Sequence, residues 1–308
     1  MFLGIDGGQS STTALIGDET GRVTGYGRGG PCNHVKGPGG REKFVSAISG
    51  CLASAGGEGL RFRSVCGGFS GGPADKEQLL EEMFPGAQVF STNDARIALT
   101  GATAGEPGII TIGGTGSIAF GRGRGGRTAR AGGWGYVFGD EGGGFDLARQ
   151  ALRAALREEE GWGPRTSLTQ ALLDETGAAN VNDLLHRFYT SDWPRPRIAA
   201  LSRLVDREAA NGDRVAGDLI HAAAQQLAGY TSAVRGMLFE PGESARVAWI
   251  GGVFQSDLLR ERYRLIVELE DGNICAPPEY PPAAGALLEA YRLAGLNVAL
   301  TGVPELSK

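Results

Sequence analysis

Short apolar runs alternate with amphipathic segments along the first third of the chain, and this alternation predicts an α/β fold. Short apolar runs bounded by turn residues are typical of strands. They predict strands over residues 2–5, 11–16, 22–26, 63–66 and 88–90. Apolar residues at helical spacing predict helices over residues 42–55, 75–84 and 93–104. The order indicates a strand meander followed by alternating strands and helices.

The same kinds of segment return in the second part of the chain. Strands are predicted over residues 109–112, 118–121 and 247–250, and helices within 145–239, from Gln255 onward and over 283–294. We therefore expect an N-terminal α/β lobe over residues 1–105, completed by the returning C-terminal segment 283–308. The C-terminal lobe is expected over residues 106–282, with a helical insertion.

The last helix of that insertion carries an apolar stripe at helical spacing, which predicts a side packed into the core. Its members are Val215, Leu219, Ala223, Leu227, Tyr230, Val234 and Met237.

Three apolar runs end in a pair of glycines, at Gly7-Gly8, Gly113-Gly114 and Gly251-Gly252. Ligands of α/β sheets bind at the carboxyl ends of the strands, and adjacent amides without side chains can surround phosphate oxygens. The pattern predicts a nucleotide held between two related lobes, with ordinary turn glycines as the alternative. Neither the P-loop motif nor a G-x-G-x-x-G motif opening a helix occurs in the chain, so those nucleotide sites are excluded.

Composition narrows the class of protein. The chain has 308 residues, of which 41% are hydrophobic, 21% are charged and 52 are glycine, and this composition is typical of a globular protein. Its net charge of −5 gives no surplus of basic residues that would bind nucleic acid. We expect neither a transmembrane helix nor a signal peptide, and therefore a cytoplasmic protein without nucleic-acid or membrane partners. The four cysteines form no C-x-x-C pair, which gives a zinc site no support.

Two acidic residues are candidates for chemistry. Asp6 ends the first strand directly before two glycines, and a buried carboxylate there would be explained by Mg²⁺ held through water, or else by a turn cap. Asp94 lies where a strand turns into a helix, so its carboxylate can face a ligand close to a helix N-terminus, or serve as an ordinary cap. The hydroxyls of residues 10–13 include a candidate phosphate contact.

Several motifs together resemble a known family. The segment Leu3–Ser10 resembles the first phosphate motif of the sugar kinase/Hsp70/actin superfamily, Ile109–Ser117 the second, and Val247–Val253 the adenosine motif. The most specific part is Gly132-Gly133-Trp134-Gly135 followed by Gly139-Asp140-Glu141-Gly142. With Asn33-His34 and Ser91–Ala95, these motifs resemble the N-acetylglucosamine kinases of the BadF/BadG/BcrA/BcrD ATPase family.

The resemblance implies two ribonuclease-H-like lobes of the actin-like ATPase kind, with ATP and sugar in the cleft between them. It implies ATP- and Mg²⁺-dependent phosphorylation of an amino sugar, N-acetylglucosamine or glucosamine, at its 6-hydroxyl, with Asp94 as catalytic base. The implied sugar-binding residues are Asn33, Ser70, Gly71, Asp94, Gly133, Trp134 and Asp140. The implied ATP-binding residues are Gly7, Gly8, Gln9, Ser10, Ser11, Gly114, Thr115, Gly116, Gly251 and Gly252. Asp6 would hold the magnesium ion.

The sequence leaves three other functions open. An activator ATPase of acyl-CoA dehydratases needs cysteines around an iron–sulfur cluster, and Cys66 and Cys275 are far apart in the sequence. A non-catalytic sugar or nucleotide sensor is a second alternative, and a ROK-type sugar kinase, which usually carries a Cys- and His-rich zinc motif, is a third. The resemblance places Val35 where animal N-acetylglucosamine kinase has a tryptophan that helps hold the acetyl group of the sugar. The sequence therefore leaves the preferred amino sugar open. The oligomeric state is also open, with a homodimer as one option.

Overall fold

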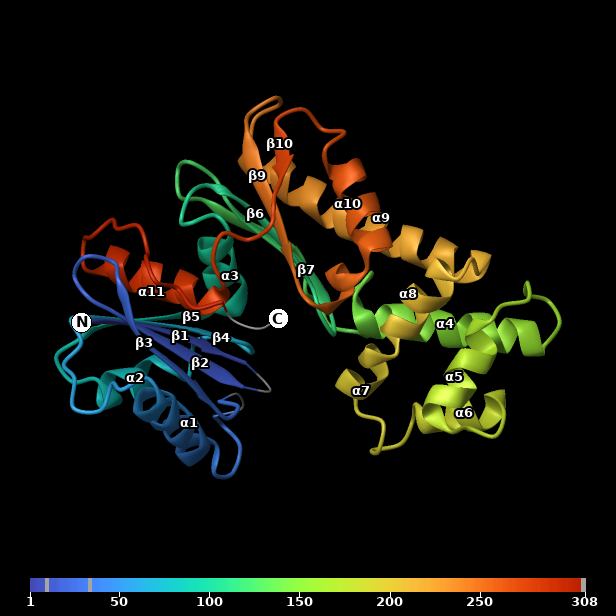
Figure 1. The fold of residues 1–308 in the computed structure, drawn as a ribbon, viewed down its shortest axis with the longest axis horizontal. Helices are drawn as coiled ribbons and strands as arrows, with labels where there is room; N and C mark the ends of the chain where they lie inside the picture. Colours follow the sequence, from blue (N-terminus) through green and yellow to red (C-terminus); the bar gives the residue numbers. More distant parts are fainter. Residues whose placement is uncertain (9–10, 33–34, 306–308) are drawn as a thin grey trace. The chain divides into compact units, whose positions relative to one another are not determined.

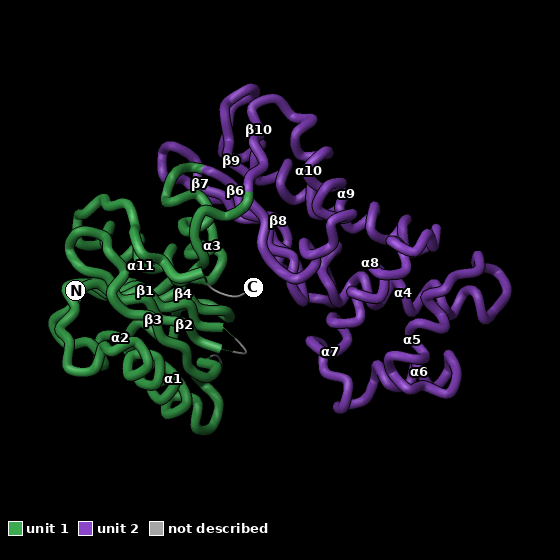
Figure 2. Tube along the Cα trace, in the orientation of Figure 1, with its two compact units in different colours: residues 1–107, 277–308 green, residues 108–276 purple. Residues whose placement is uncertain are grey.

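A computed structural model describes residues 1–8, 11–32 and 35–305. The chain divides into two compact units (Figure 2). Unit 1 comprises residues 1–107 and 277–308, and unit 2 comprises residues 108–276. Each unit has an α/β architecture built on one five-stranded sheet, which confirms the predicted fold class.

The sheet of unit 1 has the order β3-β2-β1-β4-β5. Its strands are β1 (Phe2–Gly7), β2 (Thr12–Gly17), β3 (Val23–Gly29), β4 (Ser64–Phe69) and β5 (Gln88–Asn93). The first three strands pair antiparallel, whereas β4 runs parallel to both β1 and β5. The carboxyl ends of β1, β4 and β5 therefore lie at one edge of the sheet.

Helices cover both faces of this sheet (Figure 1). They are α1 (Gly40–Ser54), α2 (Glu77–Met83), α3 (Asp94–Ala102) and α11 (Pro282–Leu293). Side chains alternate along β1, so Leu3 and Ile5 enter the core with α1 and α2, while Phe2 packs with Leu287 of α11. Helix α11 is the last helix of the described residues, and it packs against α3 and β1.

Two glycines allow α3 and α11 to approach each other closely. A Cβ atom built on Gly285 of α11 would lie 1.9 Å from the carbonyl oxygen of Ile97, and one on Gly101 of α3 would lie 2.7 Å from that of Pro281. Backbone rather than side-chain atoms fill this space, so the helices cannot admit a methyl group without moving apart.

Gly285→Ala is expected to destabilise unit 1 by about 1–3 kcal/mol or more, because overpacking displaces backbone. Gly50→Ala is the matched control: Gly50 is exposed in α1 and a Cβ atom there meets nothing within 4 Å. Removing a helical glycine at such a site stabilises by about 0.5–1 kcal/mol. Thermal and urea unfolding of the two variants measures both effects, and equal stabilities would contradict this account of the α3–α11 contact.

The sheet of unit 2 has the order β10-β9-β6-β7-β8, and the same topology as the sheet of unit 1. Its strands are β6 (Gly108–Gly113), β7 (Ser117–Arg122), β8 (Thr128–Gly132), β9 (Ala245–Ile250) and β10 (Asn273–Cys275). Strands β6, β7 and β8 pair antiparallel, and β9 runs parallel to β6 and β10. Strands β8 and β10 were not predicted from the sequence, since β8 holds mainly small and polar residues and β10 has only 3 residues.

Helices form most of the rest of unit 2. They are α4 (Gly144–Glu159), α5 (Leu168–Thr176), α6 (Val181–Arg187), α7 (Arg195–Ala200), α8 (Ser202–Ala210), α9 (Arg214–Leu238) and α10 (Asp257–Val267), with the 3-10 turn η1 (Gly252–Gln255). The long helix α9 packs on the sheet through its predicted stripe, except that Met237 is 49% exposed rather than buried. Residues 1–8, 11–32 and 35–305 contain no helix both long and apolar enough to cross a membrane.

Candidate functional site

The parallel strands of unit 1 bring several predicted residues to one edge of its sheet. Gly7 pairs with Phe69, and Phe69 pairs with Asn93, so the three strands end at the same level. The backbone N–H of Ser70 donates to the carbonyl of Gly7 at 3.1 Å, which joins the first glycine turn to the segment after β4. Asp6, Ser70 and Asp94 thus belong to one edge.

Asp94 is the first residue of α3. The preceding Asn93 caps the helix, since its side-chain oxygen accepts a hydrogen bond from Arg96 N at 2.8 Å. Asp94 Oδ1 accepts a hydrogen bond from Ala95 N at 2.9 Å, and the residue is exposed. Protein atoms crowded around the carboxyl group nevertheless raise its pKa by desolvation, against the opposite effect of the backbone N–H groups.

Asp6 lies within β1 and is partly buried. Desolvation raises the pKa of Asp6 to about 7, and the negative charge of Asp94 adds to the rise. Two carboxylates that repel each other are a suitable environment for a divalent cation, which would relieve the repulsion. Mg²⁺ commonly takes one or two protein carboxylates and completes its shell with phosphate and water. The residues present therefore fit a magnesium ion, although the described residues hold no group of three or more His, Cys, Asp or Glu side chains placed to bind a metal.

Gly7, Ser70 and Gly71 lie at or just after the ends of β1 and β4. A Cβ atom on Gly7 would lie 2.3 Å from the Phe69 ring and 2.5 Å from Cys32 Sγ, so only glycine fits. Ser70 Oγ is buried, and it has no hydrogen-bond partner among the described residues. Gly71 follows with φ +84°, a conformation that glycine adopts without strain. An unsatisfied buried hydroxyl at this edge suits a polar ligand.

A feature that the sequence analysis missed stabilises this segment. Lys76 is 2% exposed, and its ammonium group donates to Gly72 O at 2.8 Å and to Asp75 Oδ1 at 3.0 Å. A single lysine within a polar segment gives no sequence signal of burial, because lysine side chains are mostly exposed.

In unit 2, the two glycine turns that follow parallel strands touch each other. β6 and β9 pair in register, with Ile112 opposite Ile250. Gly251 has φ +107°, and a Cβ atom there would lie 2.3 Å from Gly113 O and 3.1 Å from Gly114 N. Both the backbone angle and the contact require glycine at residue 251. The second phosphate motif and the adenosine motif are therefore neighbours.

The loop after β6 presents backbone N–H groups. The carbonyl groups of this loop bond to the N-terminus of α4, since Gly144 N donates to Gly114 O at 2.8 Å and Phe145 N donates to Thr115 O at 3.0 Å. The N–H groups of Thr115 and Gly116 have no hydrogen-bond partner in the part of the chain that the structure describes. Free amides next to a helix N-terminus suit anionic oxygens.

The segment after β8 folds against the same loop. Gly133 N donates to Ser117 O at 2.9 Å. Asp140 is buried, has φ +63°, and accepts a hydrogen bond from Gly135 N at 3.3 Å. A Cβ atom on Gly116 would lie 2.2 Å from Asp140 Oδ2, so the carboxylate lies directly against the phosphate motif.

Trp134 is 67% exposed, and the guanidinium of Arg130 lies 4.8 Å from its ring centre. The ring is not part of a core, and one of its faces is occupied by that guanidinium. Of the other predicted residues, Gly8 and Ser11 join through a backbone hydrogen bond of 2.9 Å, Gly252 opens η1, and Gln9, Ser10 and Asn33 lie outside the described residues.

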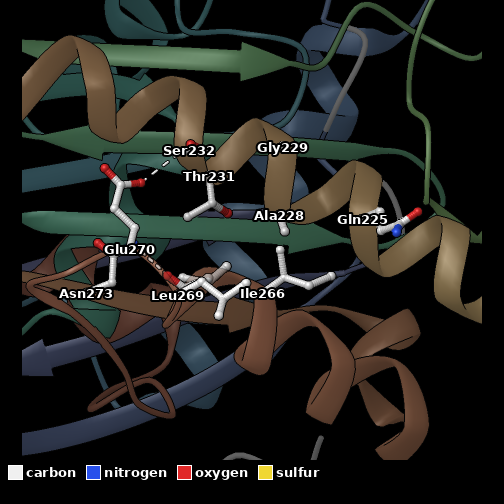
Figure 3. Close-up of a pocket in the computed structure, with 10 residues that line it drawn as sticks. Gln225, Ala228, Gly229, Thr231, Ser232, Ile266, Leu269, Glu270 and Asn273 are labelled. Carbon is white, nitrogen blue, oxygen red and sulfur yellow. Dashed lines mark hydrogen bonds between the residues drawn. The ribbon is translucent and has the colours of Figure 1, made fainter.

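A groove elsewhere in unit 2 lies between α9 and α10 (Figure 3). Apolar side chains such as Ile266 and Leu269 line it, together with polar side chains such as Ser232 and Glu270. No predicted site residue lines this groove, so it is separate from the loops described above.

Several known proteins are similar to this chain. The BadF/BadG/BcrA/BcrD ATPase family model matches residues 3–290. An N-acetylmuramic acid/N-acetylglucosamine kinase of Clostridium acetobutylicum is 33% identical over 212 residues, which are 67% of this chain and 69% of that protein. An N-acetyl-D-glucosamine kinase of Dictyostelium discoideum is 29% identical over 288 residues, which are 85% of this chain and 89% of that protein.

A solved structure is also similar. It is that of a candidate N-acetylglucosamine kinase from Chromobacterium violaceum, with a TM-score of 0.74 and 26% identity, covering 93% of this chain and 97% of that one. The resemblance inferred from the sequence motifs is confirmed: the chain belongs to the BadF/BadG/BcrA/BcrD ATPase family.

Proposed function

We propose that this protein is a kinase that transfers the γ-phosphoryl group of ATP to the 6-hydroxyl of an amino sugar, N-acetylglucosamine or glucosamine. The observation that carries the proposal is Asp94, a carboxylate at a helix N-terminus on the sheet edge where β1, β4 and β5 end. The names of the similar proteins support an amino sugar as the acceptor.

In this proposal Asp94 is the general base. It accepts the proton of the sugar hydroxyl while that oxygen forms a bond to the γ-phosphorus, and the bond from phosphorus to the β-phosphate oxygen breaks to release ADP. A raised pKa makes the Asp94 carboxylate a better proton acceptor than an ordinary aspartate. Most of the rate enhancement of such reactions comes from positioning and charge stabilisation.

The glycine turns bind the nucleotide in the proposed mechanism. The amides of Thr115 and Gly116 and the Thr115 hydroxyl hold phosphate oxygens, and Gly251 and Gly252 leave room for the adenosine. Gly7, Gly8, Gln9, Ser10 and Ser11 form the other phosphate turn. Asp6 would hold Mg²⁺, which when bound neutralises charge on the transferred phosphoryl group.

The sugar contacts of the proposal are the residues that the sequence motifs imply. Ser70 would supply its buried hydroxyl and Gly71 its backbone, while Asn33, Gly133 and Asp140 would supply further hydrogen bonds. Trp134 can offer only the ring face that Arg130 leaves open. Val35 packs against the core of unit 1, and the proposal therefore includes glucosamine as well as its N-acetyl form.

A phosphorylation screen tests the proposal. The purified chain with Mg-ATP is offered glucosamine, N-acetylglucosamine, N-acetylmannosamine, N-acetylmuramic acid and glucose. We expect ADP formation that depends on an amino sugar, and a product whose phosphorus couples to the C6 protons in NMR. Sugar binding without ADP formation would replace the kinase by a sensor, and sugar-independent ATP hydrolysis with bound iron would replace it by an activator ATPase.

A further inference from the structure

We propose that Tyr230 is a positioning residue for sugar phosphorylation, which acts through Glu141 on the segment 139–142 and thereby on Asp140. The inference rests on the proposed function and adds to it a residue that the motifs do not include. Tyr230 belongs to the stripe of α9 that the sequence analysis assigned to core packing.

The phenol of Tyr230 makes a specific polar contact. It donates a hydrogen bond to the Glu141 carboxylate, and both residues are partly buried. Desolvation, and then the contact with Glu141, raise the pKa of Tyr230, so the phenol stays protonated and remains a donor. A hydrogen bond to an ionised acceptor is stronger than one between neutral groups.

Further contacts fix the same segment from two sides. Ser117 Oγ, at the start of β7, donates to the backbone carbonyl of Glu141 at 2.6 Å. On the other side, a Cβ atom on Gly142 would lie 2.8 Å from Ala223 O of α9. A Cβ atom on Gly132 would lie 2.9 Å from the Tyr230 ring, so the ring also supports the end of β8.

The constraint matters because Asp140 has an unfavourable backbone conformation. A non-glycine residue with positive φ persists only where its surroundings hold it, and such residues cluster at functional sites. Asp140 directly precedes Glu141, and its carboxylate lies against Gly116. Loss of the Tyr230–Glu141 bond therefore frees the segment next to the phosphate motif, while the aromatic packing of Tyr230 stays in place.

Tyr230→Phe tests the inference, because it removes only the phenolic oxygen. We expect kcat/KM for the amino sugar to fall by about 10–100-fold, the scale of one hydrogen bond to a charged group. Glu141→Met, which keeps the length of the side chain but has no oxygen to accept the phenolic hydrogen bond, should lower kcat/KM in the same direction. The kcat/KM of the double variant should be no lower than that of the worse single variant, because both substitutions remove the same Tyr230–Glu141 hydrogen bond.

Tyr263→Phe is the matched control. Its phenol is fully buried in the same unit and bonds Thr111 Oγ at 2.9 Å and Thr231 Oγ at 2.8 Å. We expect it to lower the Tm at least as much as Tyr230→Phe, with kcat/KM near the wild-type value.

The two proposals fail in different ways. A wild-type chain that phosphorylates no amino sugar overturns the proposed function. An active wild type with unchanged kcat/KM in Tyr230→Phe overturns only the role of Tyr230. The same holds if the losses of Tyr230→Phe and Glu141→Met are additive, or if Tyr263→Phe loses as much kcat/KM.

Discussion

Asp94→Asn is expected to lower kcat by about 10²–10⁴-fold, the contribution of a general base to proton transfer. The amide keeps the size of the side chain and can still accept the hydrogen bond from Ala95 N. It cannot take up the proton of the sugar hydroxyl. Because the substitution leaves the glycine turns unchanged, ATP affinity measured by calorimetry should stay close to that of the wild type.

Asn93→Ala is the control for Asp94→Asn. Asn93 caps α3 through its bond from Arg96 N, so its loss should cost about 1 kcal/mol of stability. Its effect on kcat should be far smaller than that of Asp94→Asn. Near-normal turnover in Asp94→Asn would remove Asp94 from the mechanism, and a similar kcat loss in both variants would indicate a helix-terminus effect instead of a base.

Asp6→Asn is expected to abolish most of the kinase activity while it stabilises the chain in the absence of magnesium and nucleotide. The folded-state pKa of Asp6 is about 7, above the value of 3.8 for the group in an unfolded chain. At a pH between these two pKa values, the Asp6 carboxyl group is protonated in the folded chain and ionised in the unfolded chain. Folding is therefore favoured at low pH, and that contribution is lost as the pH rises through about 7.

The amide has no charge to bury, so the stabilisation by Asp6→Asn depends on pH. We expect the Tm of Asp6→Asn to exceed that of the wild type by an amount that grows between about pH 4 and about pH 7 and then levels off, with an energy on the order of a few kcal/mol. Asp18→Asn is a control with the opposite sign, since hydrogen bonds from Thr20 lower the pKa of Asp18. A wild-type Tm that rises relative to Asp6→Asn above pH 7 would refute the burial of an uncompensated carboxylate.

The strand-end glycines are the part of the site that the sequence predicts best. An apolar run followed by two glycines reflects a local requirement, and residues 7, 251 and 252 lie where such runs end. The proximity of Asp6 and Asp94 is different. It follows from the parallel pairing of β1, β4 and β5, which joins residues some 90 positions apart and leaves no local periodicity.

Periodicity also hides individual roles within a helix. The stripe of α9 predicts that Tyr230 faces the protein interior, which is correct, but the same pattern fits a phenol bonded to Glu141 and one packed only in the core. Met237 follows the same spacing and is exposed near the end of the helix. Hydrophobic spacing identifies a face, whereas the partner of each side chain depends on the tertiary structure.

The place of α11 in unit 1 has a consequence for synthesis of the chain. Phe2 and Leu15 are synthesised before unit 2, whereas Leu287 and Tyr291, which pack with them, are synthesised after it. Helix α3 covers part of that face of the first sheet, and the part that α11 covers stays exposed while unit 2 is synthesised. We expect a chaperone that binds apolar surface to protect the nascent chain from aggregation until α11 has been synthesised.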